Sequence, residues 1–254
     1  MRLATLLKRG RKALMIVAIA AIAAGAAPNA PAAAGSVTQT GRDIVVVLHG
    51  LGRGKSAMRR LASRLEEAGY RAIRIGYQSL QDTPEEILRD IGKKIENCCL
   101  RKSPNLHFVG HSLGGLLIRA YLARHKPANR GHVVLIGTPN NGTKIVDKLR
   151  DNWWFQMLGP MAQALGTDAN GFSKTLGRPD YPVGVIAGIK AGTDNEALLP
   201  GEDDGLVSIE STKISGMSDF VVVDAGHSAL RYDKRVVRHV VSFLKTGRFD
   251  KRRR

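Results

Sequence analysis

The chain has 254 residues, of which 43% are hydrophobic, and this is enough for one substantial buried core and one folded domain. Its 39 Lys and Arg outnumber its 22 Asp and Glu, which gives a formal net charge of +17 and favours contact with anionic surfaces. The basic residues are not interleaved with stacking aromatics, and no nucleic-acid-binding motif accompanies them. A nucleic-acid partner is therefore not expected.

The N-terminal segment differs in composition from the rest of the chain. Five basic residues up to Lys12 precede an uncharged apolar run over residues 13–27, and the three alanines at 32–34 offer a small-x-small cleavage site. The run is shorter than the roughly 20 residues that cross a bilayer as a helix. We therefore predict a cleaved signal peptide over residues 1–34 and a periplasmic or secreted protein, with an uncleaved N-terminal membrane anchor as the alternative.

A linker over residues 35–42, a catalytic domain over 43–247 and a basic tail over 248–254 are expected after the signal peptide. Without the five basic residues up to Lys12 the formal charge is still +12. The tail ends in three arginines, which we interpret first as a solvated segment and second as a contact with phosphate-bearing lipids. A peripheral contact with an anionic membrane surface is therefore a possible partnership.

The fold class is predicted from apolar runs that alternate with helical patterns, a rhythm typical of a mostly parallel central sheet with helices on both faces. We expect strands at residues 44–48, 70–75, 106–109, 133–136, 183–187 and 220–223, and helices at 56–68, 84–99, 113–124 and 234–244. Thr83 and Glu86 form a capping box at the start of the second helix. The class is α/β.

A long insertion over residues 140–182 separates two of the expected strands and is interpreted as a helical cap. Both tryptophans of the chain, Trp153 and Trp154, lie in it side by side. They are candidate substrate-binding residues, which either line an acyl pocket or face a lipid surface. Ordinary packing of the cap on the sheet is the alternative.

The two cysteines, Cys98 and Cys99, are adjacent at the end of an expected helix. This is neither a metal-ligand spacing nor a disulfide framework. A bridge between neighbours would strain the peptide between them, so we expect free thiols or an intermolecular bond. No metal and no cofactor are expected.

The candidate nucleophile is Ser112, in the segment Gly-His-Ser-Leu-Gly at residues 110–114. This G-x-S-x-G pattern follows an expected strand and opens an expected helix, which is the context of a nucleophile elbow. Gly110 and Gly114 remove side chains that would clash at the bend, and Gly115 allows close helix packing. The backbone N–H groups of Leu51, in His-Gly-Leu at 49–51, and of Leu113 are the expected oxyanion hole.

A serine nucleophile requires a base and an acid, expected in the chain order Ser, acid, His. His227 fits the base best, because it follows the last expected strand, whereas other histidines lie in strands or helices and His111 is expected to face away from Ser112. Asp204 is the leading acid and Asp203 the second. Weaker candidates for the acid are Asp194, Asp219 and Asp224.

These motifs resemble the bacterial lipase and esterase branch of the α/β-hydrolases, including triacylglycerol lipases and GPI inositol-deacylase-like hydrolases. The resemblance rests also on Gly-Thr-Pro-Asn-Asn-Gly at 137–142, whose first three residues imply a structural role at the pocket edge. It rests further on Asp-Asp-Gly-Leu-Val at 203–207, which implies Asp204 as the catalytic acid. Related lipases often bind calcium through an aspartate two residues after the catalytic histidine. That position is Ala229 here, so calcium is not expected.

The expected activity is cleavage of carboxylic esters through an acyl-enzyme, and the resemblance implies triacylglycerol or phospholipid substrates. Thioesters and amides react by the same chemistry and stay open as alternatives. A second class of function is a non-catalytic module that binds an envelope lipid or a protein. Neither acyl chain length nor oligomeric state follows from the sequence.

Overall fold

The computed structural model describes residues 41–100, 103–190, 199 and 201–251. The predicted signal peptide and the candidate acid Asp194 lie outside the described residues, as do most of the linker and the last three residues of the basic tail.

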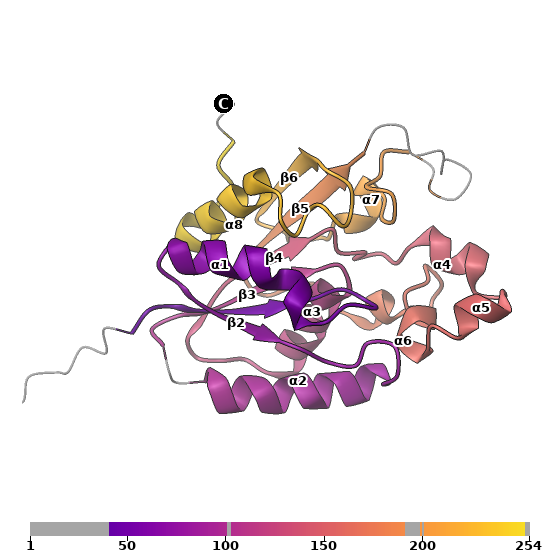
Figure 1. The fold of residues 1–254 in the computed structure, drawn as a ribbon, viewed down its shortest axis with the longest axis horizontal. Coiled ribbons are helices and arrows are strands. Elements are labelled where there is room, and N and C mark those ends of the chain that lie inside the picture. The colour runs from indigo at the N-terminus through magenta and orange to yellow at the C-terminus, as the bar shows by residue number, and fades with distance from the viewer. Residues whose placement is uncertain (1–40, 101–102, 191–198, 200, 252–254) are drawn as a thin grey trace, which may run out of the picture. The chain divides into compact units, whose positions relative to one another are not determined.

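Six parallel strands form one sheet in the order β2-β1-β3-β4-β5-β6 (Figure 1). They are β1 Ile44–Leu48, β2 Arg71–Ile75, β3 Leu106–His111, β4 Arg130–Ile136, β5 Val183–Ile189 and β6 Asp219–Asp224. The strand order reverses at β1, because β2 is added on one side of it and β3 on the other. Ligands of open parallel sheets bind at such a switch point, beyond the carboxyl ends of the strands. The topology therefore places a site where β1 and β3 end.

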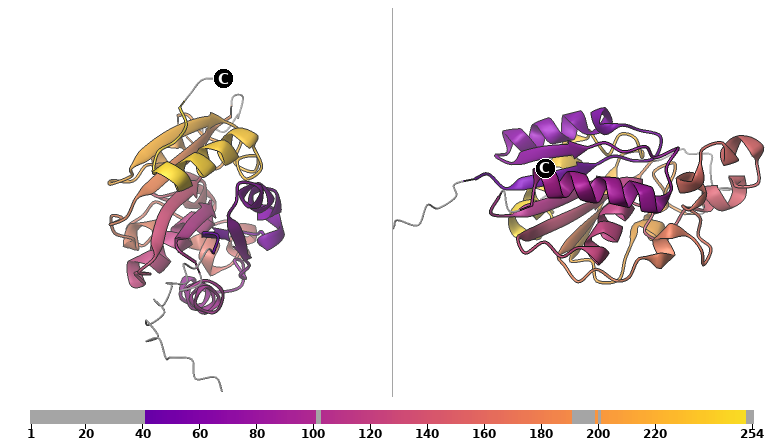
Figure 2. Two further views of the ribbon diagram at one scale, coloured as in Figure 1. Left: turned by 90° about the vertical axis from the view of Figure 1, so that its left-hand side faces the viewer. Right: turned by 90° about the horizontal axis from the view of Figure 1, so that it is seen from below.

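Helices cover both faces of the sheet, as a parallel sheet requires (Figure 2). On one face lie α1 Arg59–Glu67 and α8 Lys234–Thr246, and on the other lie α2 Pro84–Cys98 and α3 Leu113–Arg124. Side chains of β1 alternate between the two apolar clusters, with Val45 and Val47 on the α1 side and Ile44, Val46 and Leu48 on the other. Both faces of β1 are therefore buried in the hydrophobic core.

The predicted strands and helices are confirmed, with small differences at their ends. The expected helix at 56–68 begins as a 3-10 turn, Lys55–Met58, before α1. The capping box at Thr83 is present, with the Thr83 N–H donating to Glu86 Oε2 at 2.9 Å. Strand β3 runs two residues beyond the expected end because Gly110 pairs with Leu48 and Leu135 on its two neighbours, whereas a glycine in sequence reads as the end of a strand.

The 140–182 insertion forms the expected helical cap, and it projects beyond one end of the sheet (Figures 1 and 2). Its helical segments are short, namely α4 Lys144–Leu149, α5 Trp153–Gln156, α6 Pro160–Gln163 and the 3-10 turn η2 Phe172–Thr175. Phe155, Met161 and Leu165 are buried and belong to the core cluster on the α2–α3 face. Within the described residues, no helix is long and apolar enough to cross a membrane.

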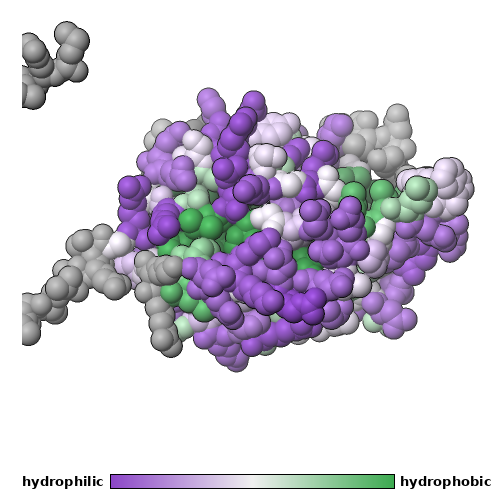
Figure 3. Space-filling model, turned by 60° about the horizontal axis from the view of Figure 1, so that its bottom comes forward, coloured by the Kyte–Doolittle hydropathy of each residue, from purple (hydrophilic) through white to green (hydrophobic). Residues whose placement is uncertain are grey.

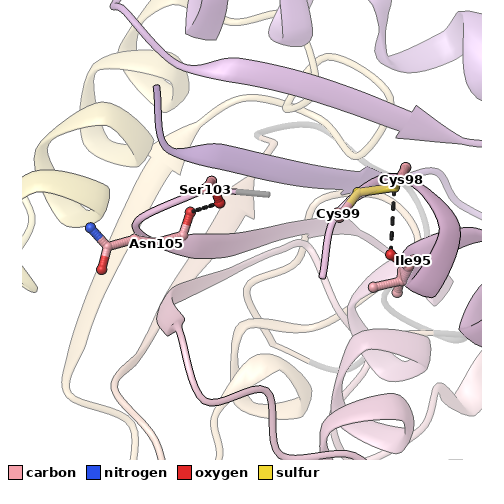
Figure 4. Close-up of a disulfide and its surroundings, with 5 residues drawn as sticks. All are labelled: Ile95, Cys98, Cys99, Ser103 and Asn105. Carbon is pink, nitrogen blue, oxygen red and sulfur yellow. Dashed lines mark hydrogen bonds between the residues drawn. A yellow bond between two sulfur atoms is a disulfide. The ribbon is translucent and has the colours of Figure 1, made fainter. Parts of the chain in front are cut away.

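The expectation of free thiols or an intermolecular bond at Cys98 and Cys99 is wrong. The two form a disulfide with each other at the end of α2 (Figure 4). Cys98 is the last helical residue, and Cys99 leaves the helical conformation with φ −132° and ψ −33°. The bend at the helix end brings the neighbouring sulfurs together, and the sequence spacing alone does not reveal this bend.

Candidate active site

Ser112 lies on a tight turn between β3 and α3. Its backbone has φ 55° and ψ −126°, and it is the one non-glycine residue with positive φ in the described part of the chain. Such backbone strain persists only where the surroundings impose it, and it is common at active sites. Ser112 is half-buried and directly follows the carboxyl end of β3, which is where the strand order predicts a site.

The glycines around Ser112 permit this turn through close backbone contacts. A Cβ on Gly110 would lie 2.5 Å from the Gly115 nitrogen, and one on Gly114 would lie 2.6 Å from the His49 carbonyl oxygen. A Cβ on Gly115 would meet the Thr138 side chain at 2.0 Å. Backbone atoms therefore exclude a side chain at Gly110 and at Gly114, as expected from the sequence. The Thr138 side chain, which follows β4, excludes one at Gly115.

His227 and Asp204 form a buried pair after β6 and β5. The His227 Nδ1 donates to Asp204 Oδ2 at 2.7 Å, and the His227 N–H donates to the Asp204 carbonyl at 2.8 Å. The other carboxylate oxygen of Asp204 accepts from the N–H groups of Leu206 at 3.0 Å and Val207 at 2.8 Å. These bonds hold Asp204 in one orientation. The bond to Asp204 uses the His227 Nδ1, so the Nε2 atom takes no part in it.

The other candidate acids have different contacts. The Asp203 Oδ1 accepts from the Gly205 N–H at 2.5 Å and so shapes the turn beside Asp204. Asp219 accepts from the Phe220 N–H and from the Phe249 N–H and pairs with Lys251 at 2.7 Å. Asp224 is exposed. Asp204 is the carboxylate that accepts from the His227 Nδ1.

The segment after β1 approaches Ser112 closely. A Cβ on Gly50 would lie 3.1 Å from Ser112 Cβ and 3.5 Å from its Oγ, so the backbone at 50–51 lines the serine side chain. Within the described residues, the Leu51 N–H has no hydrogen-bond acceptor. Leu113 is the first residue of α3, and the first N–H groups of a helix have no acceptor within it. Both expected oxyanion donors are thus available.

A buried clamp fixes the segment that carries Leu51. The His49 ring stacks on Tyr77 at 4.0 Å, its Nδ1 donates to the Gly50 carbonyl, and the Tyr77 hydroxyl donates to the His49 carbonyl. Ser79 accepts from the Gly52 N–H at 2.9 Å. Burial lowers the pKa of His49 and raises that of Tyr77, so both rings stay neutral near pH 7. The sequence does not reveal this clamp, because His49 follows β1 whereas Tyr77 and Ser79 follow β2.

His111, which was expected to face away from Ser112, contacts the segment that carries His227. Its ring lies 4.8 Å from that of His227, and its Nε2 donates to the His227 carbonyl at 2.9 Å. Burial, and then the neighbouring His227, hold the pKa of His111 well below its usual value. His111 is therefore a neutral residue that ties the elbow to the base-bearing segment.

Ser112 and His227 open on a cavity of about 200 Å³ beneath the cap. Pro139 and Leu51 both line it. Apolar side chains of the cap and of the segment after Asp204 also line it, namely Ile145, Val146, Phe155, Leu165, Leu206 and Val207. The sequence does not reveal these lining residues, since an apolar residue of a cap has the same pattern whether it faces the core or a ligand.

The tryptophans do not line this cavity, so their predicted pocket-lining role is wrong. Trp153 is 74% exposed, Trp154 46% and Met157 75%. Figure 3 shows hydrophobic surface at the end of the molecule that carries the cap, bordered by hydrophilic surface. The lipid-facing alternative stays a prediction.

Among the described residues, no group of three or more His, Cys, Asp or Glu side chains is arranged to hold a metal ion.

The fold and the site define a serine hydrolase of the α/β-hydrolase fold, of the esterase, lipase or thioesterase type. The sequence matches the palmitoyl protein thioesterase family over residues 44–175, just over half of the chain. The chain belongs to this family. No curated protein matches its sequence.

Solved structures of hydrolases share the fold. The mature lipase BlEst2 of Bacillus licheniformis superposes with a TM-score of 0.64 at 18% identity, over 83% of this chain and 94% of that one. A metagenomic carboxyl esterase, MGS0156, gives 0.60 at 15% identity, over 82% and 71%. The RedJ thioesterase of Streptomyces coelicolor gives 0.52 at 16% identity, over 89% and 90%. At these identities the likeness concerns the fold.

We predict that Asp204→Asn lowers kcat on the order of 10³- to 10⁴-fold, because the base then loses the carboxylate that holds its tautomer. Steady-state kinetics on a chromogenic ester measures this, with the thermal midpoint as a check of folding. Asp203→Asn is the matched control and should lower kcat far less. The reverse order of the two variants would move the acid to Asp203.

Proposed function

We propose that this protein cleaves carboxylic esters of apolar acyl groups, with Ser112 as nucleophile, His227 as general base and Asp204 as the acid that orients it. The observation that carries the proposal is the 2.7 Å bond between His227 Nδ1 and Asp204 Oδ2, in a pair whose histidine opens on the same cavity as Ser112. A serine hydroxyl needs such a base to become a nucleophile.

The mechanism has two steps, acylation of Ser112 and hydrolysis of the acyl-serine. First, His227 Nε2 takes the Ser112 proton as Oγ attacks the ester carbonyl, and it returns that proton to the departing alcohol, which leaves an acyl-serine. Water then adds to the acyl-serine by the same route, and the acid is released as Ser112 regains its proton. The N–H groups of Leu51 and Leu113 stabilise the oxyanion of each intermediate, a contribution of about 3 kcal/mol per donor.

Thioester cleavage is a second candidate, and the match to the palmitoyl protein thioesterase family favours it. A thiol is a better leaving group than an alcohol, so the same residues suffice. The apolar walls of the cavity fit an acyl chain in both cases.

We also propose a peripheral contact of the cap with an anionic membrane. Three exposed side chains of the cap, Trp153, Trp154 and Met157, support it, together with the positive charge of the chain. Aromatic side chains with a polar edge favour the boundary between lipid and water.

The proposed location is the periplasm or the medium, after removal of residues 1–34. The composition of that segment supports this, and so does the Cys98–Cys99 disulfide, since disulfides persist in oxidising compartments.

For the activity, we predict that a fluorophosphonate labels the wild-type protein stoichiometrically and leaves Ser112→Ala unlabelled. A matched pair, p-nitrophenyl hexanoate and S-hexanoyl-N-acetylcysteamine, then distinguishes an ester from a thioester preference through kcat/KM. Absence of both labelling and turnover in a folded protein would favour the non-catalytic binding module instead.

For the membrane contact, the intrinsic fluorescence is a direct probe, because Trp153 and Trp154 are the two tryptophans of the chain. Vesicles of phosphatidylglycerol should shift the emission to the blue. Met157→Lys should weaken vesicle binding about tenfold, since it removes an apolar side chain that would be buried. Gln156→Lys, with the same added charge in α5, should not weaken it. Equal losses in both variants would contradict apolar insertion.

For the location, mass spectrometry of the protein isolated from its native host should give a mature N-terminus at or near Gly35. A protein that begins at Met1 or Arg2 would favour the uncleaved anchor.

A further inference from the structure

The walls of the catalytic cavity differ in chemistry. The cap supplies an apolar wall that includes Ile145, Phe155 and Leu165. Two arginines line the cavity from other segments: Arg53 follows β1, and Arg231 lies between His227 and α8. An acyl chain accounts for the apolar wall and leaves the two cations without a function.

Neither arginine has a carboxylate partner among the described residues. Arg231 Nε donates to the Ser228 carbonyl at 2.9 Å, and its guanidinium lies 5.9 Å from the Tyr232 ring. Arg53 is exposed and forms no hydrogen bond or ion pair within the described part of the chain. The Asp204 carboxylate binds His227 and the N–H groups of Leu206 and Val207, and it forms no ion pair with either arginine within the described residues.

The two cations also act on each other and on the elbow. Burial, and then the charge of Arg53, lower the pKa of Arg231. Both arginines contribute to the low pKa of His111, the residue before Ser112, after the larger effects of burial and His227. Uncompensated positive charge is thus concentrated beside the nucleophile, and a bound anion would relieve the repulsion.

We infer that Arg53 and Arg231 form an anion subsite for a phosphate group on the alcohol or thiol part of the substrate. This inference rests on the proposed function. The acyl chain occupies the apolar wall, so the charged group belongs to the part of the substrate that leaves. Guanidinium groups suit phosphate, because their planar N–H groups donate to two oxygens at once. A phospholipid head group and a soluble phosphate-bearing thiol both supply this chemistry.

The test uses two pairs of six-carbon substrates that differ in charge, on the full-length protein. Hexanoyl-coenzyme A is compared with S-hexanoyl-N-acetylcysteamine, and monomeric dihexanoylphosphatidylglycerol with dihexanoylglycerol. The readout is the ratio of kcat/KM for the anionic member to that for the neutral member. We expect the Arg53→Gln, Arg231→Gln double variant to lower this ratio about tenfold or more, as for the loss of charge-assisted hydrogen bonds.

Two controls separate the subsite from net charge and from folding. Arg71→Gln removes the same charge from an exposed residue at the amino end of β2, away from the cavity, and should leave the ratio unchanged. Arg231→Lys keeps the charge but loses the planar pair of donors, so it should lower the ratio less than Arg231→Gln does. A fall in the coenzyme A pair alone identifies a soluble thioester, a fall in the phosphatidylglycerol pair alone identifies a lipid head group, and a fall in both identifies phosphate itself.

An unchanged ratio in the double variant in both pairs, with Ser112-dependent turnover of the neutral substrates, would overturn the subsite and leave the proposed function standing. A fall of equal size in Arg71→Gln would also overturn it. Absence of turnover of all four substrates, together with no fluorophosphonate labelling, would overturn the proposed function and the subsite with it.

Discussion

The strained turn at Ser112 is the constraint on which the rest of the site depends. A positive φ at a residue with a side chain costs on the order of 1–3 kcal/mol, so the surroundings must hold it there. Here the backbone of β1 and α3 does so, by approaching Gly110 and Gly114 more closely than any Cβ would allow. The turn therefore fixes the serine, the start of α3 and the neighbouring end of β1 as one unit.

The parallel sheet brings the remaining groups to this unit. Because all six strands run the same way, the residues that follow β1, β3, β5 and β6 meet at one edge of the sheet. Leu51, Ser112, Asp204 and His227 each follow one of these strands. Two buried histidines connect the segments, since His49 anchors the loop after β1 and His111 binds the carbonyl of His227. The geometry is thus held by the core, by the hydrogen bonds of these two histidines, and by the bonds that the Asp204 carboxylate accepts from His227, Leu206 and Val207.

The lining of the catalytic cavity combines apolar side chains with two arginines. The apolar walls of the cavity fit an acyl chain whether its carbonyl is bonded to oxygen or to sulfur, and they do not select the leaving group. Two arginines without carboxylate partners in the described residues add a requirement that concerns the leaving group, whichever atom is acylated. A preference for an anionic over a neutral leaving group is thus a separate property from a preference for an ester over a thioester.

The sequence by itself determined the features that are local. Alternating apolar runs predict the strands, glycines at fixed offsets predict the elbow, and Thr83 with Glu86 predicts a helix start, because each depends on residues a few positions apart. Asp204 and His227 followed from chain order after a strand, with Asp203 as an open alternative. Only the tertiary structure decided what depends on distant segments: the contact of Asp204 with His227, the position of His111, the Cys98–Cys99 disulfide, and which residues of the cap and loops face the cavity. An arginine, an isoleucine or a tryptophan has the same pattern in sequence whether it faces solvent, core or ligand, and packing of the chain resolves that choice.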